Sequence, residues 1–186
     1  MTHTLTIEPL GVELEIEDGQ TILDAALRAG IYLPHACCHG LCATCKIAVL
    51  DGEIEHGEAS SFALMDFERD EGKALACCAT VESDVTIEAD IEEDPDAEVI
   101  PIRDFAGTVS RIEDLTPTVK GIWIDLPAGA ALRFQAGQYV NLRLPDGIGH
   151  RAFSIASAPS EGNTIELNVR RVPGGLGTAF LHDRLA

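Results

Sequence analysis

The sequence predicts an α+β protein built from two domains, and three observations support this. Residues 1–98 contain 23 acidic side chains against 4 Lys or Arg, whereas residues 99–186 contain 8 against 9, so the net charge of −18 falls almost entirely on the first part. The first part also alternates short strands with helical segments, whereas the second is a series of strands separated by turn residues. We therefore expect a mixed α/β domain over 1–92, an acidic linker over 93–101 and an antiparallel barrel over 102–186.

The first domain opens with two segments of alternating polarity separated by Leu10-Gly11, which predicts a β-hairpin. A helix is expected over 21–30, because Thr21 can cap its start and Gly30 suits the position just after its end. Further along, Asp51-Gly52 indicates a second hairpin, and Ser60 or Ser61 is expected to cap a short helix that runs through Arg69. The expected strands are residues 5–8, 12–16, 46–50, 75–77 and 85–87.

The second domain shows evenly spaced strand segments with Pro, Gly, Asp or Asn between them, the pattern of an antiparallel barrel or sandwich. The expected strands are residues 106–113, 119–126, 138–144, 151–157 and 164–172, and a helix is expected to begin within 176–185.

Composition excludes several classes of function. No apolar run approaches the eighteen or so residues of a membrane span, and the N-terminus lacks the basic and apolar regions of a signal peptide. We therefore expect a cytoplasmic protein with no membrane association. The strong acidity argues against nucleic acid, whose phosphates would be repelled. It serves either solubility alone or an acidic docking face for a redox partner.

Six cysteines carry the clearest chemical signal. Cys37, Cys42 and Cys45 follow the pattern C-x4-C-x2-C, and only Cys37, not Cys38, gives the four-residue gap. A distant fourth cysteine completes the spacing of a plant-type 2Fe-2S site, in which each iron takes two thiolates. Either Cys77 or Cys78 could be that ligand. Because successive strand residues point to opposite sides, we expect only one of them to face the cluster.

Other interpretations of the cysteines fit less well. Zinc can use C-x2-C, but the C-x4-C arm and the adjacent pair of cysteines do not match its usual spacing. A Rieske centre needs a later C-x2-H, which does not occur. Disulfides are not expected in a cytoplasmic chain. His35, His39 and His56 show no spacing that suggests ligation, so they are expected in solvated or packing roles.

The residues from Pro34 to Lys46 and the string GEASSFALMDFERDEGKALACCATVESDVTIEAD, residues 57–90, resemble the ferredoxin domain of phenol hydroxylase reductase components. The resemblance continues through GTVSRIEDLTPTVKGIWIDLP and FQAGQYVNLRLP into RAFSIASAP and covers essentially the whole chain. It implies that Cys77 is the fourth ligand, because the family places that cysteine seven residues before the position matched by Asp84. It also specifies the fold: a β-grasp 2Fe-2S ferredoxin domain, then an incomplete antiparallel β-barrel FAD-binding domain of ferredoxin-reductase type.

The resemblance further implies a reaction. Members of this family pass electrons from NADH through FAD and a 2Fe-2S cluster to the di-iron hydroxylase of a multicomponent aromatic monooxygenase. The chain would then be an NADH-dependent oxidoreductase component with that hydroxylase as its partner. The alternatives are a ferredoxin-like carrier without reductase activity, and the reductase of a dioxygenase-type oxygenase, since the same modules recur with different partners.

The flavin-binding residues are also expected from the resemblance. Arg151-Ala-Phe-Ser matches the family motif in which Arg151 would pair with FAD phosphate, Phe153 would lie against the flavin and Ser154 would hydrogen-bond its ring. The run from Gly174 through Gly175 to Thr178 matches a second motif, which would bring backbone amides and a hydroxyl to the pyrophosphate.

The family's third part, an NAD-binding domain, has no counterpart in these residues, nor do the last strands of the FAD domain. We therefore expect the chain to be a fragment of a longer protein. On its own it is expected to bind FAD poorly and not to oxidise NADH efficiently, because the flavin pocket would be open on one side.

Overall fold

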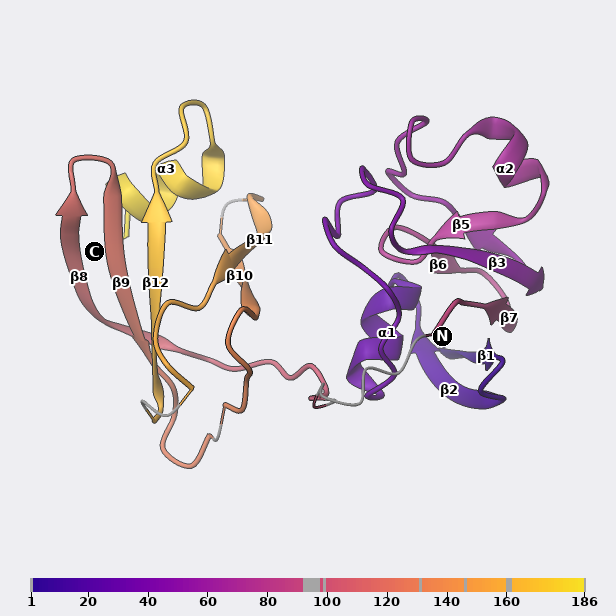
Figure 1. Ribbon diagram of the computed structural model, residues 1–186, viewed down its shortest axis with the longest axis horizontal. Helices are drawn as coiled ribbons and strands as arrows, with labels where there is room; N and C mark the ends of the chain where they lie inside the picture. The colour runs from indigo at the N-terminus through magenta and orange to yellow at the C-terminus, as the bar shows by residue number, and fades with distance from the viewer. Residues whose placement is uncertain are drawn as a thin grey trace. The chain divides into compact units, whose positions relative to one another are not determined.

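The computed structural model describes residues 2–91, 98, 100–130, 132–145, 147–159 and 162–185. The chain divides into two compact units, Met1–Arg103 and Asp104–Ala186, each described here by itself (Figure 1). The predicted linker, residues 93–101, lies largely outside the described residues.

The N-terminal unit is a five-stranded mixed sheet with the order β2-β1-β7-β3-β5 (Figure 1). β1 pairs antiparallel with β2, as the predicted hairpin requires, and parallel with β7 from the other end of the unit. A short pair, β4 with β6, lies beside this sheet. The strands are β1 Thr2–Glu8, β2 Val12–Glu17, β3 Lys46–Asp51, β4 Ile54–Glu55, β5 Lys73–Leu75, β6 Thr80–Val81 and β7 Val85–Glu88.

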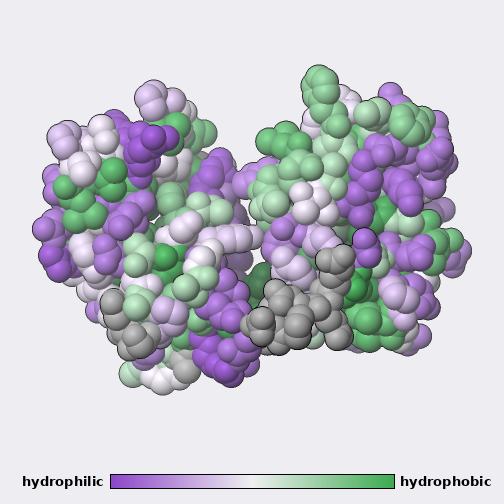
Figure 2. Space-filling model, in the orientation of Figure 1, coloured by the Kyte–Doolittle hydropathy of each residue, from purple (hydrophilic) through white to green (hydrophobic). Residues whose placement is uncertain are grey.

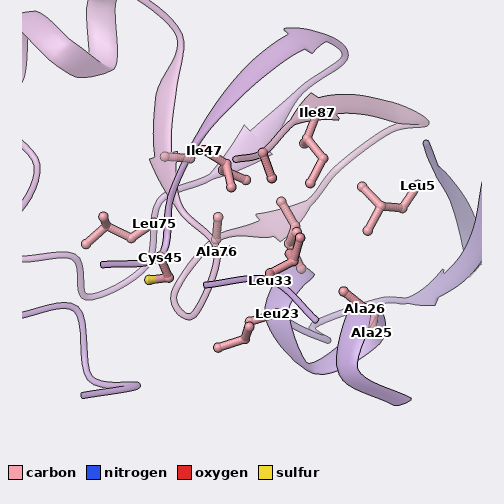
Figure 3. Packing of buried hydrophobic residues seen from close by; sticks show 14 of the residues in the cluster. Leu5, Leu23, Ala25, Ala26, Leu33, Cys45, Ile47, Leu75, Ala76 and Ile87 are labelled. Atoms are coloured by element: carbon pink, nitrogen blue, oxygen red, sulfur yellow. The ribbon is translucent and has the colours of Figure 1, made fainter. Parts of the chain in front are cut away.

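Helix α1, Ile22–Arg28, begins and ends as its sequence predicts. The Thr21 hydroxyl accepts a hydrogen bond from the Asp24 amide at 3.3 Å, and Gly30 after the helix adopts a φ of 80°. The helix buries Ile22, Leu23 and two alanines in the core of the unit. This core continues through Leu33, Leu75 and Ala76 to Cys45, so that a candidate ligand lies at its border (Figure 3).

The hairpin predicted at Asp51-Gly52 is wrong. β3 already has β7 on one edge and β5 on the other, so β4 cannot fold back onto it and pairs with β6 instead. Gly52 is needed for another reason: a Cβ there would lie 2.2 Å from the Asp84 carbonyl oxygen. The Asp51-Gly52 pair therefore marks a close approach of two chain segments and not a hairpin.

The second predicted helix begins later than expected. Helix α2 is Asp66–Asp70, with Met65 at its N-cap, and the Glu68 carboxylate accepts the Met65 amide at 2.9 Å. Ser60 begins a separate turn instead, in which its carbonyl oxygen accepts the amides of Ala63 and Leu64. The cap was misassigned because a serine favours either kind of turn.

The C-terminal unit is antiparallel throughout the described residues, as predicted. β12, β9 and β8 form one sheet, β10 and β11 form a hairpin, and a bridge from Ile155 to Leu167 joins the end of this hairpin to β12. The strands are β8 Thr108–Thr116, β9 Val119–Asp125, β10 Tyr139–Leu144, β11 Gly149–Ser154 and β12 Thr164–Arg170. Helix α3, Leu176–Asp183, lies where a helix was expected, and Lys120 Nζ donates to the carbonyl oxygen of His182 near its end.

Candidate functional site

The candidate ligands of the N-terminal unit lie on two irregular segments. Cys37, Cys42 and Cys45 lie on the loop between α1 and β3, and Cys77 lies in the turn after β5. We call residues 37–45 the cysteine loop. Its backbone is left-handed at three places: Cys38, Gly40 and Ala43 have φ values of 54°, 70° and 60°.

This backbone turns amide groups toward the first cysteine. The N–H groups of His39 and Leu41 both point at the Cys37 sulfur, with N···Sγ distances of 3.4 Å. Turns in which right-handed and left-handed residues alternate arrange their N–H groups in a concave array that favours a negatively charged guest. Such amides stabilise the extra negative charge that an iron–sulfur site gains on reduction.

The predicted ligands influence one another's titration. Cys42 Sγ lies 3.2 Å from the Thr44 hydroxyl oxygen, and hydrogen bonds with Thr44 and Cys37 lower the pKa of Cys42 to about 6. Cys45 contacts Cys77, and this hydrogen bond together with burial raises the pKa of Cys45; only 4 % of the residue is exposed. Two pairs of thiolates are the donor set that two tetrahedral irons require.

The expectation that Cys77 and Cys78 point apart is wrong. They occupy a turn, in which the amide of Cys78 donates to the Leu75 carbonyl oxygen, so strand alternation does not apply. Their sulfurs lie 3.6 Å apart. Cys78 packs against the cysteine loop, where its Sγ would lie 2.7 Å from a Cβ on Gly40, and burial raises its pKa.

The donor chemistry of the candidate ligands suits an iron–sulfur site. Within the described residues, no group of three or more His, Cys, Asp or Glu side chains is already gathered around one metal position. The candidate donors are cysteine sulfurs, and two backbone amides are directed at the sulfur of Cys37. Soft thiolate donors with amide support suit an iron–sulfur cluster.

The predicted flavin residues of the C-terminal unit lie on β11. Arg151 and Phe153 share one face of the strand and are half-buried, whereas Ser154 lies on the other face and is exposed. Phe153 also packs against the core of the unit. Arg151 Nη1 donates to the carbonyl oxygen of His150 at 2.6 Å.

The second flavin motif forms the loop before α3. Gly174 has a φ of 75° and Gly175 is the N-cap of the helix, so the loop turns directly into the first amides of α3. The Thr178 hydroxyl folds back on this loop, accepting the Val172 amide at 3.1 Å and lying 3.2 Å from the Gly175 carbonyl oxygen.

The structure brings the two flavin motifs together. A Cβ on Gly177, in the first turn of α3, would lie 2.9 Å from Cγ of Arg151. The arginine stem therefore runs against the start of the helix. A guanidinium beside free helical amides is a suitable arrangement for phosphate oxygens.

One pair of side chains next to the flavin motif is not predictable from sequence patterns. Arg143 on β10 lies opposite His150 on β11, with 3.2 Å between Nε and Nε2, immediately beside Arg151. Only the strand register reveals this pair, because seven residues separate its members.

No helix within the described ranges is long and apolar enough to cross a membrane.

Comparisons with known proteins match both units. The model of the 2Fe-2S iron-sulfur cluster binding domain matches residues 5–82, and that of the oxidoreductase FAD-binding domain matches residues 106–186. The reductase component DmpP of phenol 2-monooxygenase from Pseudomonas sp. (strain CF600) is 56% identical over 185 residues, which cover 100% of this chain and 52% of that protein. The phenol hydroxylase P5 protein of Acinetobacter pittii is 53% identical over 186 residues, with 100% and 52% covered.

Solved structures show the same architecture. The crystal structure of the Amycolatopsis reductase GcoB matches with a TM-score of 0.87 and 38% identity, over 100% of this chain and 54% of that one. The ferredoxin reductase in carbazole 1,9a-dioxygenase matches with a TM-score of 0.82 and 25% identity, over 100% and 55%.

The chain therefore combines a 2Fe-2S ferredoxin domain with an FAD-binding domain of ferredoxin-reductase type. It is similar to reductase components of phenol hydroxylases, and it spans about half the length of the curated relatives it matches.

Proposed function

We propose that this chain is the electron-transfer part of a reductase component of phenol 2-monooxygenase type. In this role it passes electrons that originate in NADH through FAD and a 2Fe-2S cluster to a di-iron hydroxylase. FAD supplies the exchange between paired and single electrons, and the cluster carries one electron at a time. The observation that carries the proposal is the cysteine loop, which directs two backbone amides at the Cys37 sulfur, in a chain that matches both a 2Fe-2S cluster binding domain and a flavin-binding domain.

At the iron–sulfur site each cysteine pair would hold one iron. Cys37 and Cys42 lie on the more accessible side, and Cys45 and Cys77 lie against the core. The amides directed at Cys37 favour negative charge on that sulfur, which stabilises the reduced state. The burial of Cys45 keeps water from the inner pair.

At the flavin site the chain's own residues would bind and orient the cofactor. Arg151 would exchange its bond with the His150 carbonyl for bonds to phosphate, and Thr178 would turn from Val172 toward the same group. Phe153 would contact the flavin ring and Ser154 would hydrogen-bond it. The proximity of Gly177 to the Arg151 side chain supports this assignment, because it brings the two motifs next to each other.

The proposed partner, a di-iron hydroxylase, would dock beside the cysteine loop. Leu41 in that loop is 67% exposed, and Phe62, two residues after the Ser60 amide that bonds the loop, is 92% exposed. Figure 2 shows apolar surface over the loops at the top of the N-terminal unit. Acidic residues dominate the rest of the unit's sequence, so the matching surface would have an apolar centre and a basic rim.

The absorbance spectrum of the purified chain tests the flavin half of the proposal. Iron–sulfur and flavin bands should both appear after reconstitution, and Arg151→Gln should weaken FAD binding about tenfold to a hundredfold, because it removes a charge-assisted hydrogen bond. Arg170→Gln is the matched control, since Arg170 lies exposed on the neighbouring strand β12. A chain that shows only iron–sulfur bands at saturating FAD is a carrier without a working flavin site.

A further inference from the structure

A short segment of chain lies over the cysteine loop. We call this segment, residues 57–60, the strap. The amide of Ser60 donates to the carbonyl oxygen of Gly40 in the loop at 3.0 Å. A Cβ on Gly40 would lie 3.1 Å from both the Cα of Ala59 and the carbonyl oxygen of Glu58. Strap and loop are thus in direct backbone contact, at a position where only glycine fits.

The strap also contacts the turn that holds the fourth ligand. A Cβ on Gly57 would lie 2.7 Å from the Cys78 carbonyl oxygen, and a Cβ on Gly40 would lie 2.7 Å from the Cys78 sulfur. Strap, cysteine loop and turn therefore pack against one another around Cys78. Any movement of the strap changes the support of both segments that carry ligands.

The side chain of Arg69 also holds the strap in place. Arg69 on α2 donates from Nη2 to the Ala59 carbonyl oxygen at 2.9 Å. Its Nε is buried without a hydrogen-bond partner among the described residues, so this bond is the polar contact that fixes the guanidinium. The preceding residue, Glu68, accepts a bond of 2.6 Å from Lys46, which follows Cys45 directly. Helix α2 therefore supports the cysteine loop in two ways: Glu68 binds Lys46 directly after the end of the loop, and Arg69 binds the strap.

We propose that Arg69 is a positioning residue for the iron–sulfur site. It holds the strap against the cysteine loop, which keeps the loop amides directed at Cys37 and excludes water from the inner cysteine pair. This inference rests on the proposed function, because it assumes that the cysteines hold a cluster. A neutral side chain at this position loses the charge-assisted bond and releases the strap.

The test compares Arg69→Gln with Lys73→Gln in the full chain after cluster reconstitution. Lys73 lines the same cavity of about 370 Å³ as Arg69, so its substitution removes the same charge nearby. Arg69→Gln should lose visible absorbance to a chelator about tenfold faster than the unaltered chain. It should also shift the EPR lines of the reduced cluster and speed hydrogen exchange at the Ser60 amide. Lys73→Gln should match the unaltered chain, and Arg69→Lys should restore part of the loss.

Equal behaviour of Arg69→Gln and Lys73→Gln, with unchanged exchange at Ser60, overturns the proposal. If circular dichroism shows that Arg69→Gln does not fold, Arg69→Lys becomes the test variant, because it keeps the charge but not the geometry of the guanidinium. Unchanged hydrogen exchange at Ser60 and unchanged EPR lines in Arg69→Lys also overturn the proposal. If the unaltered chain holds no cluster, the proposed function fails, and exchange at Ser60 still tells whether Arg69 holds the strap.

Discussion

The N-terminal unit builds its site in a loop that neighbouring segments enclose, whereas the C-terminal unit builds its site on a strand face and a helix start. In the first, Gly40 is buried and the amides of the loop already point at Cys37. In the second, Arg151 and Thr178 are bonded to the protein's own backbone. One site is therefore prepared for its group, whereas the other must exchange internal bonds for bonds to its ligand.

The largest effect is expected when a ligand of the iron–sulfur site is removed. Cys77→Ser should abolish the cluster or destabilise it severely, because it removes one thiolate of the buried pair with Cys45. Cys78→Ser should leave the EPR signal nearly unchanged, because Cys78 is not one of the predicted ligands and the smaller serine fits the same contact with Gly40. EPR of the reduced chains distinguishes the two, and the reverse pattern would exchange the roles of these neighbours.

The two units should also differ in how much stability they lose when a glycine with a positive φ is replaced by alanine. Gly40→Ala should destabilise the cluster-loaded unit by several kcal/mol, because the new Cβ meets backbone as well as the Cys78 sulfur, in addition to about 1 kcal/mol of strain. Gly174→Ala in the flavin loop should cost about 1 kcal/mol, because its φ is also positive but nothing lies within 4 Å of the new Cβ.

Denaturant unfolding of both variants measures this difference. Visible absorbance follows the N-terminal unit, and the fluorescence of Trp123, the single tryptophan, follows the C-terminal unit. Equal losses of stability in the two variants would show that the cysteine loop can move away from the strap, and the contrast between the sites would then be much smaller.

Sequence spacing was enough to find the cysteine loop, because three ligands lie within nine residues and a fixed spacing describes one loop. It was equally sufficient for α1, whose cap residues act locally. The outcome differed for the residues around Cys78. Their strand was predicted from local pattern, but the chain turns there, and the packing of Gly40 on Cys78 joins positions far apart in sequence.

The failed hairpin at Asp51-Gly52 has the same cause. A turn signal reports the conformation of four residues, but the partner of β3 depends on which strands occupy its edges, and β7 arrives from more than thirty residues later. In the C-terminal unit the pattern worked better, because strands that follow one another in the sequence, β8 with β9 and β10 with β11, pair antiparallel. The pair of Arg143 with His150 still required that register, since neither residue belongs to a recognisable motif.

The smallest expected effect concerns pH and belongs to the N-terminal unit. Burial, and after it the charge of Arg69, lower the pKa of His56 from its usual range. The unfolded chain therefore binds a proton more readily than the folded one, and the contribution of neutral His56 to stability is lost as the pH falls below about 6.5. His56→Gln should flatten this part of the pH dependence, with a smaller change in the denaturation midpoint than either glycine variant gives. Urea unfolding at pH 7.5 and 5.5 measures it, with His3→Gln as the control on β1; equal slopes for all three chains would mean that His56 titrates as it does in the unfolded state.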